Sequence, residues 1–349
     1  DASVVGSSYT DGGGGGGGGG DRPEQCRNNC RWPYNPNKGG FTTTAFHGAL
    51  SDYLCPSMFR DLSDWVFKWP FSHFKEKVKT ADPDVAARCL SPVPIVYTHA
   101  SNYAGVAEWS KQKLRRPFIL VSGQSDFGAS KGKALLGDSN LLRWYSQNAD
   151  ITHPKLYPLP IGLNCFEHAP EMHQTLGQLG NVQRNKVLMV NFGNTHPSRK
   201  QVWEQFCGKN ANKPFATCKV KSQSNNIQGN PHLVSYYKKV AEHKFVLSPR
   251  GNGLDTHRLW EALYLGCIPV VGSSILDGLY SGFPILVVKD WSKIDERYLH
   301  NEYQRMKPLL RQSVPAMHRE YWWRTIESAR SGFMRSLGMP NATRYKCWG

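Results

Sequence analysis

Short, continuous runs of apolar residues alternate along this chain with segments that have helical spacing. The apolar runs are too short for helices, and they predict buried strands at residues 95–97, 117–122, 186–192, 245–247, 268–271 and 285–288. Helical spacing predicts helices at 140–148, 199–206 and 256–265 and a terminal helix within 311–337, while prolines indicate an extended segment at 156–163. Strands that are apolar throughout and alternate with helices are typical of parallel sheets covered on both faces.

These elements fall into two blocks, and 349 residues are enough for two domains. We therefore predict an α/β protein with two Rossmann-like, doubly wound domains that face a cleft. We expect the N-terminal domain at residues 26–180, the C-terminal domain at 181–310, and a helix and tail at 311–349. Residues 1–25 are expected to be a disordered stem, because residues 12–20 are all glycine and can bury nothing.

The chain is strongly basic, with 43 Lys and Arg against 27 Asp and Glu and a net charge of +16. Such a charge favours polyanionic partners, including nucleic acid, acidic glycans and phosphate-bearing cofactors. The cations are dispersed, however, because the densest cluster, residues 111–116, holds only four and no nucleic-acid fold motif accompanies it. We therefore expect no nucleic-acid partner.

The cysteines bear on the cellular compartment. There are nine, so at least one is unpaired, and Cys207 and Cys218 flank a polar loop that suits a local disulfide. Asn-Ala-Thr at 341–343 matches a glycosylation site, and both features favour the lumen of the secretory pathway. No segment approaches the ~20 apolar residues that span a bilayer. The chain starts at Asp1 rather than Met, so a signal or membrane anchor could have preceded it.

One segment, residues 244–271, combines a strand, a glycine-containing loop, a helix and a second strand. The loop at 250–253 reads Arg-Gly-Asn-Gly, and its two glycines permit a tight turn and a close approach of the backbone to a ligand. Asp255 is the predicted N-cap of the helix and Gly266 its C-terminal stop.

Charged side chains follow the first strand of this segment. Ligands of parallel sheets bind beyond the carboxyl ends of strands, where helix N-termini favour anions. Arg250 lies in the loop, Arg258 in the first turn of the helix, and Glu261 three residues further on. Two guanidinium groups suit a diphosphate, and a carboxylate can accept hydrogen bonds from ribose hydroxyls. The alternative is that Arg258 and Glu261 form an ordinary surface ion pair.

The same segment resembles the signature of exostosin-like glycosyltransferases, which are glycosyltransferase family 47 and its algal and plant relatives. The matching residues are Ser248, Pro249, Arg250, Gly251, Arg258, Glu261, Ala262, Gly266, Cys267, Ile268, Pro269 and Val270. A weaker similarity extends over residues 144–148, 158–163 and 192–199.

The resemblance implies a GT-B fold with the nucleotide in the C-terminal domain. It implies inverting transfer of a sugar from a nucleotide diphosphate, usually a UDP-sugar, to a glycan or glycoprotein acceptor, without an obligatory metal. It also implies a type II membrane-anchored enzyme of the Golgi or secretory-pathway lumen. By analogy, Arg250, Gly251 and Arg258 would hold the diphosphate and Glu261 the ribose. Arg199 could also reach the phosphates, or it could be an ordinary solvated helix residue.

Inverting transfer needs a general base for the acceptor hydroxyl, and this base should come from the N-terminal domain. Asp126, in the loop after the strand at 117–122, is one candidate. His99, after the strand at 95–97, is the other, and either residue could instead cap a helix or a turn. Neither candidate is preferred by the family resemblance.

Two further hypotheses and one misleading motif remain. Asp82 and Asp84 match an Asp-x-Asp metal-binding pattern, but the intervening Pro83 favours a helix start capped by Asp82, so we expect no metal site there.

The chain could also be a catalytically inactive relative that binds glycan. A third hypothesis is a polyanion-binding protein that uses the net charge of +16.

Overall fold

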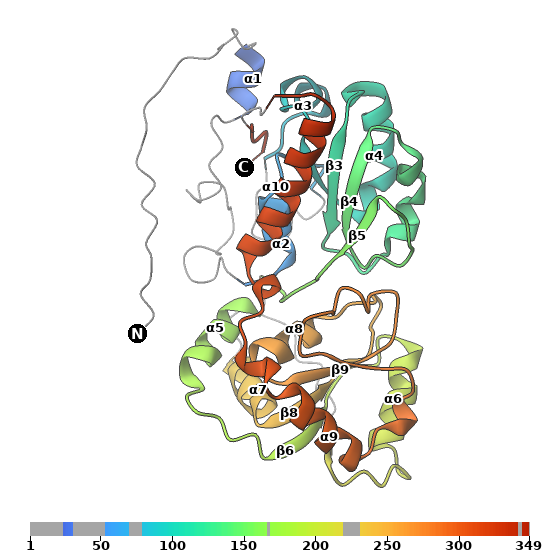
Figure 1. The fold of residues 1–349 in the computed structure, drawn as a ribbon, viewed down its shortest axis with the longest axis vertical. Helices are drawn as coiled ribbons and strands as arrows, with labels where there is room; N and C mark the ends of the chain where they lie inside the picture. The colour runs from blue at the N-terminus through green and yellow to red at the C-terminus, as the bar shows by residue number, and fades with distance from the viewer. Residues whose placement is uncertain are drawn as a thin grey trace.

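The computed structural model describes residues 24–30, 53–69, 79–165, 168–218, 231–340 and 344–348. These residues form two α/β domains (Figure 1). The predicted stem at 1–25 lies outside the described residues, apart from its last two, which begin helix α1 (Glu24–Asn29). The predicted glycosylation site at 341–343 also lies outside them.

The N-terminal domain is built on a parallel sheet whose five described strands lie side by side in chain order. These strands are β1 (Trp65–Phe67), β2 (Ile95–His99), β3 (Phe118–Gly123), β4 (Leu141–Gln147) and β5 (Leu156–Leu159). Helices α2 (Pro56–Asp61) and α10 (Arg319–Ser336) lie on one side of the sheet and α4 (Tyr103–Trp109) on the other (Figure 1). The remaining helical segments are α3 (Pro83–Cys89), a π-helix at Ser110–Leu114, and 3₁₀ helices at Ala100–Asn102 and Ala129–Gly137.

The C-terminal domain has a second parallel sheet, with the described strands in the order β10-β9-β8-β6-β7. They are β6 (Lys186–Val190), β7 (Ala216–Cys218), β8 (His243–Leu247), β9 (Ile268–Gly272) and β10 (Leu286–Val288). Its helices are α5 (Ala169–Gln178), α6 (Pro197–Cys207), α7 (Pro231–Ala241), α8 (His257–Tyr264) and α9 (Glu296–Met306), with 3₁₀ helices at Trp291–Lys293, Leu309–Arg311 and Pro315–Met317. The chain runs from β6 to β7 and then crosses back to β8, so the strand order reverses between β6 and β8.

The predicted fold class, an α/β protein with two domains on parallel sheets, is confirmed. The helix predicted at 140–148 is wrong, because Leu141–Gln147 is strand β4. This strand is paired on both edges, with β3 and β5, and buries Trp144 and Tyr145. Aromatic residues fit such a buried pleated position, and burial on both faces removes the alternation that marks a strand in the sequence.

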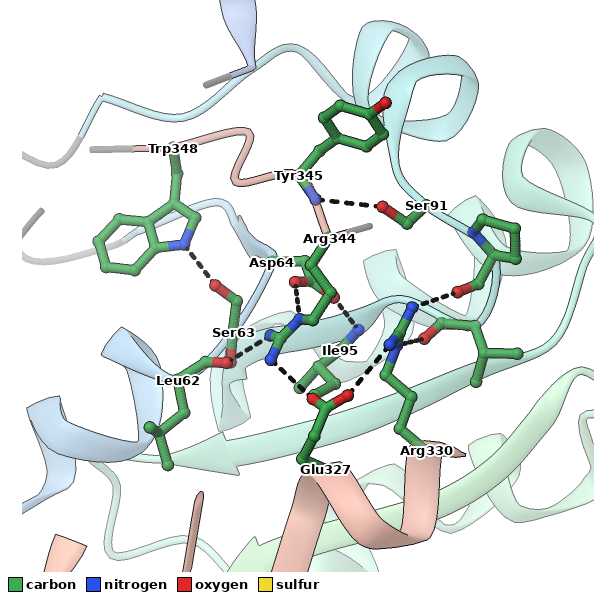
Figure 2. Close-up of polar contacts among 12 residues, drawn as sticks. Leu62, Ser63, Asp64, Ser91, Ile95, Glu327, Arg330, Arg344, Tyr345 and Trp348 are labelled. Carbon is green, nitrogen blue, oxygen red and sulfur yellow. Dashed lines mark hydrogen bonds and ion pairs between the residues drawn. The ribbon is translucent and has the colours of Figure 1, made fainter. Parts of the chain in front are cut away.

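The C-terminal end of the chain returns to the N-terminal domain. Figure 2 shows Arg344, which donates hydrogen bonds to the Asp64 carboxylate at 2.6 Å, the Glu327 carboxylate at 2.8 Å and the Leu62 carbonyl at 2.8 Å. In the same view, the Trp348 indole donates to the carbonyl of Ser63 at 3.0 Å. The predicted tail therefore packs as part of the N-terminal domain.

Four disulfides join described cysteines. They are Cys26–Cys89, Cys30–Cys347, Cys55–Cys165 and Cys207–Cys218. The predicted local disulfide between Cys207 and Cys218 is thus confirmed. The remaining cysteine, Cys267, is buried and unpaired. Across the described ranges, no helix combines the length and apolar character that crossing a membrane requires.

Candidate active site at the domain junction

The candidate donor residues lie at the carboxyl edge of the second sheet, where the strand order reverses. In open parallel sheets this reversal leaves a crevice in which ligands bind. Arg199 lies on α6, the helix that follows β6, and Arg250 lies in the loop that follows β8. Arg258 lies on the next helix, α8. The fold therefore brings three separate guanidinium groups to one edge.

The Arg199 side chain is buried and bridges two loops by hydrogen bonds. It is only 7% exposed, so the alternative of a solvated helix residue is wrong. Its Nε donates to the carbonyl of Arg250 at 2.9 Å, and Nη2 donates to that of Pro249 at 3.2 Å. Nη1 donates to the carbonyl of Gly193 at 3.1 Å. Burial, with the nearby charge of Arg258, lowers the pKa of Arg199 to about 10.

Both loop glycines are closely packed by side chains of this chain. A Cβ on Gly251 would lie 3.0 Å from the Arg199 guanidinium, and a Cβ on Gly253 would lie 2.8 Å from the Asn148 amide. Neither glycine has a positive φ, so the tight turn that we expected is not what requires them. The absence of a side chain instead lets Asn148 of the N-terminal domain and Arg199 approach the loop backbone.

Arg250 and Arg258 are held differently from Arg199. Arg250 is exposed, and its guanidinium donates to the carbonyl of Asn252 at 3.2 Å within its own loop. Arg258 is half-buried and shares a hydrogen bond with the Tyr236 side chain, while its buried Nε has no partner among the described residues. Within the described part of the chain, neither arginine is in an ion pair shorter than 4.0 Å, so the predicted surface pair of Arg258 with Glu261 is not formed.

Glu261 is buried beside Arg258 and is bonded to two residues that the sequence did not indicate. Its Oε1 lies 3.0 Å from the His168 Nδ1 and accepts a hydrogen bond from the Tyr237 hydroxyl at 3.1 Å. Burial raises the pKa of this carboxyl, but His168 and Arg258 outweigh burial and lower the pKa to about 2. The carboxylate therefore stays charged at neutral pH. The predicted contact of Glu261 with ribose stays a prediction.

Asp255 does not cap α8, and this part of the prediction is wrong. Thr256 occupies the N-cap position. The buried Asp255 carboxylate instead accepts hydrogen bonds from the Ile161 N–H at 2.8 Å and from the Trp260 indole at 2.9 Å. The carboxylate thus binds the Trp260 indole, one turn into the helix, and the backbone of the other domain. The predicted C-terminal stop is confirmed, since Gly266 has a φ of 71°.

The two candidate bases lie at the ends of neighbouring strands of the first sheet, where His99 pairs with Gly123. Asp126 is exposed, and its Oδ2 accepts a hydrogen bond at 3.3 Å from the Asn252 amide in the loop at 250–253, called the donor loop below. The His99 Nδ1 accepts from the backbone N–H of Ser101 at 3.2 Å. Burial lowers the pKa of His99, and a hydrogen bond with the backbone of Gln124 opposes this effect.

The Asp-x-Asp pattern forms a helix start, as predicted. The Asp82 carboxylate accepts a hydrogen bond from the N–H of Asp84 at 2.8 Å and caps α3. Asp84 is in turn paired with the ammonium of Lys113 at 3.1 Å. Among the residues that the structure describes, no group of three His, Cys, Asp or Glu side chains is arranged to hold a metal ion.

The exostosin GT47 domain matches residues 138–294. Similar solved structures include an α1,3-fucosyltransferase with GDP-fucose, at 11% identity and a TM-score of 0.35, covering 73% of this chain and 93% of that one. A trehalose-6-phosphate structure from E. coli bound with UDP-2-fluoro glucose has 10% identity and a TM-score of 0.34, covering 74% and 76%. The GtfA/B complex has 10% identity and a TM-score of 0.32, covering 70% of this chain and 56% of that one. No curated protein matches the chain.

The matched range extends from the start of β4 past the end of β10. It includes every residue predicted to bind the donor, namely Arg199, Arg250, Gly251, Arg258 and Glu261. Over this range the chain is similar to the exostosin-like glycosyltransferases of family 47.

Proposed function

We propose that this glycosyltransferase transfers a sugar from a UDP-sugar, with inversion, to a hydroxyl group of a glycan or glycoprotein. The observation that carries the proposal is the set of guanidinium groups at the strand reversal. The charges of Arg199 and Arg258 repel each other, which contributes to the lowered pKa of Arg199. A site that gathers several guanidinium groups favours a ligand with more than one negative charge.

Arg250 and Arg258 are the groups that we assign to the diphosphate. The donors of Arg199 are largely taken up by carbonyl groups, so we assign it to positioning the Arg250 loop. The Arg258 Nε is buried without a partner among the described residues, and leaving a charged donor unpaired is costly. The other nitrogens of this half-buried guanidinium are the groups that we assign to phosphate oxygens.

Glu261 is assigned to the ribose through its second oxygen, because Oε1 already engages His168 and Tyr237. The low pKa of about 2 keeps the carboxylate ionised, which is the form that accepts hydrogen bonds from two hydroxyls. The diphosphate and ribose groups are then one helical turn apart on α8, since Arg258 and Glu261 are separated by three residues.

Asp126 is the base that the contacts favour. The His99 ring is engaged, since Nδ1 accepts from Ser101 and the ring also has a hydrogen bond with the Gln124 backbone. Asp126 is exposed and faces the donor loop. The acceptor hydroxyl would give its proton to Asp126 as its oxygen bonds to the anomeric carbon. The bond to the diphosphate would break in the same step, with the arginines stabilising the leaving charge in place of a metal.

The four described disulfides support a place in the oxidising secretory pathway, where such bonds persist. We propose the Golgi or a neighbouring secretory lumen as the location. A type II anchor upstream of Asp1 belongs to the same proposal.

Thermal stabilisation by UDP, GDP and ADP tests the donor assignment. UDP at a hundredfold excess over its dissociation constant should stabilise the protein by ~2.7 kcal/mol. The stabilisation should disappear in Arg258→Ala and persist in Arg305→Ala, where an exposed arginine on α9 is removed. Equal and salt-sensitive stabilisation by all three nucleotides would instead support a polyanion-binding protein.

Transfer assays test the chemistry. Asp126→Asn should abolish transfer while the stabilisation by UDP remains, His99→Gln should retain transfer, and EDTA should have no effect. Loss of transfer in His99→Gln alone would move the role of base to His99. UDP binding with no transfer to a broad panel of sugars would identify an inactive relative.

A further inference from the structure

Phe127 is the most exposed of the large apolar residues that the structure describes, at 55%. It directly follows Asp126 in the loop after β3, on the side of the N-terminal domain that meets the donor loop. A single exposed apolar residue is unremarkable on most surfaces. Here its position beside the proposed base, and the rigidity of its loop, set it apart.

The backbone around Phe127 is fixed on both sides. The N–H of Phe127 donates to the Ser125 Oγ at 3.0 Å, and the Asn148 amide donates to the carbonyl of Ser125 at 2.9 Å. On the other side, the backbone of Gly128 packs so closely on the carboxylate of Asp150 that a Cβ would overlap it. The ring is therefore presented to solvent by an ordered loop, and binding at this ring requires little further ordering.

We propose that the ring of Phe127 is the platform on which the acceptor binds, and that the acceptor is a pyranose unit of a glycan. This inference rests on the proposed function. An aromatic face carries negative charge density that attracts the weakly positive C–H groups on one face of a pyranose ring. The Lys131 ammonium lies 5.9 Å from the ring centroid, where it can donate to hydroxyl or carboxylate oxygens of the same sugar.

The position of the platform agrees with the chemistry that the acceptor must undergo. Phe127 and Asp126 are consecutive residues, so their Cα atoms are about 3.8 Å apart. Asp126 in turn contacts Asn252 of the donor loop at 3.3 Å. A pyranose that contacts both Phe127 and Asp126 would present one hydroxyl to the base.

Binding of tetrasaccharides of glucose, xylose and N-acetylglucosamine, measured by calorimetry with the protein saturated with UDP, tests this platform. At least one of them should bind. Its dissociation constant should rise about tenfold in Phe127→Ala and recover in Phe127→Trp. Tyr321→Ala is the matched control, because Tyr321 on α10 is also exposed, at 42%, and lies outside the site.

Two results would overturn the platform: none of the tetrasaccharides binds, or Phe127→Ala binds them as tightly as the unaltered protein does. Stabilisation by UDP should be the same in all these variants. A chain that binds the sugars through Phe127 but does not bind UDP would retain the platform and refute the donor assignment. A chain that binds UDP but none of the sugars would retain the donor assignment and refute the platform.

Discussion

Truncation of Arg344 to alanine would leave two carboxylates without the cation that lies between them. The guanidinium contacts Asp64 at 2.6 Å and Glu327 at 2.8 Å, and also donates to the carbonyl of Leu62 (Figure 2). The Asp64 side chain is 0% exposed, so water cannot replace the lost partner. Glu327, at 27% exposed, is partly hydrated, keeps its ion pair with Arg330 at 3.1 Å and should tolerate the change better.

The expected loss in the free energy of unfolding follows from how deeply the two carboxylates are buried. Removing one partner of a buried ion pair typically destabilises a protein by about 3–5 kcal/mol, because the other charge remains buried. Asp64 would keep one hydrogen bond, from the N–H of Ile95 at 2.7 Å, which places the expected cost near the lower end of that range. For a domain of this size, such a cost corresponds to a fall in Tm of about 10 °C.

Differential scanning calorimetry at neutral pH measures this effect. Arg324→Ala on α10, the helix that also carries Glu327, is the matched control, since Arg324 is 78% exposed and its pair with Glu320 should contribute less than about 1 kcal/mol. Adding Asp64→Asn to Arg344→Ala should restore part of the loss, because the second change removes the unpaired charge. Equal Tm values for Arg344→Ala and Arg324→Ala would refute the reasoning.

Two further predictions concern the domain junction. Gly253→Ala should lower stability by roughly 1–3 kcal/mol because its Cβ would press on the Asn148 amide, whereas Gly278→Ala, with open space around it, should not; urea unfolding compares the two. The folded pKa of Glu261, about 2, lies below its ordinary value of 4.5, so its stabilising effect is present above pH 4.5 and is lost as the pH falls towards 2. The stability difference between the protein and Glu261→Gln should therefore shrink between pH 5 and pH 3, and a constant difference would contradict the low pKa.

Strands buried on both faces could be predicted wherever their residues form one continuous apolar run. Strands β2, β3, β6, β8 and β9 fit this description, and the sequence indicated all of them. In β4, Arg143 and Ser146 interrupt the apolar residues and imitate helical spacing. Its pairing with two neighbouring strands, which local sequence does not encode, decides its conformation.

The candidate site, like the fold, could be predicted from the sequence only in part. Arg250, Arg258 and Glu261 lie within one segment and could be found by their spacing. Spacing could not reveal their partners, because these come from distant parts of the chain. His168 is 93 residues from Glu261, and Asn148, whose Oδ1 accepts a hydrogen bond from the Asp255 N–H, is 107 residues from Asp255. Only the fold brings these side chains together.

The donor segment itself joins the two domains, and this has consequences for substitutions within it. Asn252 contacts Asp126 of the N-terminal domain, and Asp255 accepts a hydrogen bond from Ile161. Arg250 and Arg258, which we assign to the diphosphate, lie on either side of these contacts in the sequence. Because the interdomain contacts lie between the two arginines within nine residues, the donor site can keep its geometry only while the two domains keep theirs. Substitution of Asp255 should therefore weaken UDP binding without any contact to the nucleotide, whereas substitution of Arg258 should weaken it and leave the interdomain hydrogen bonds intact.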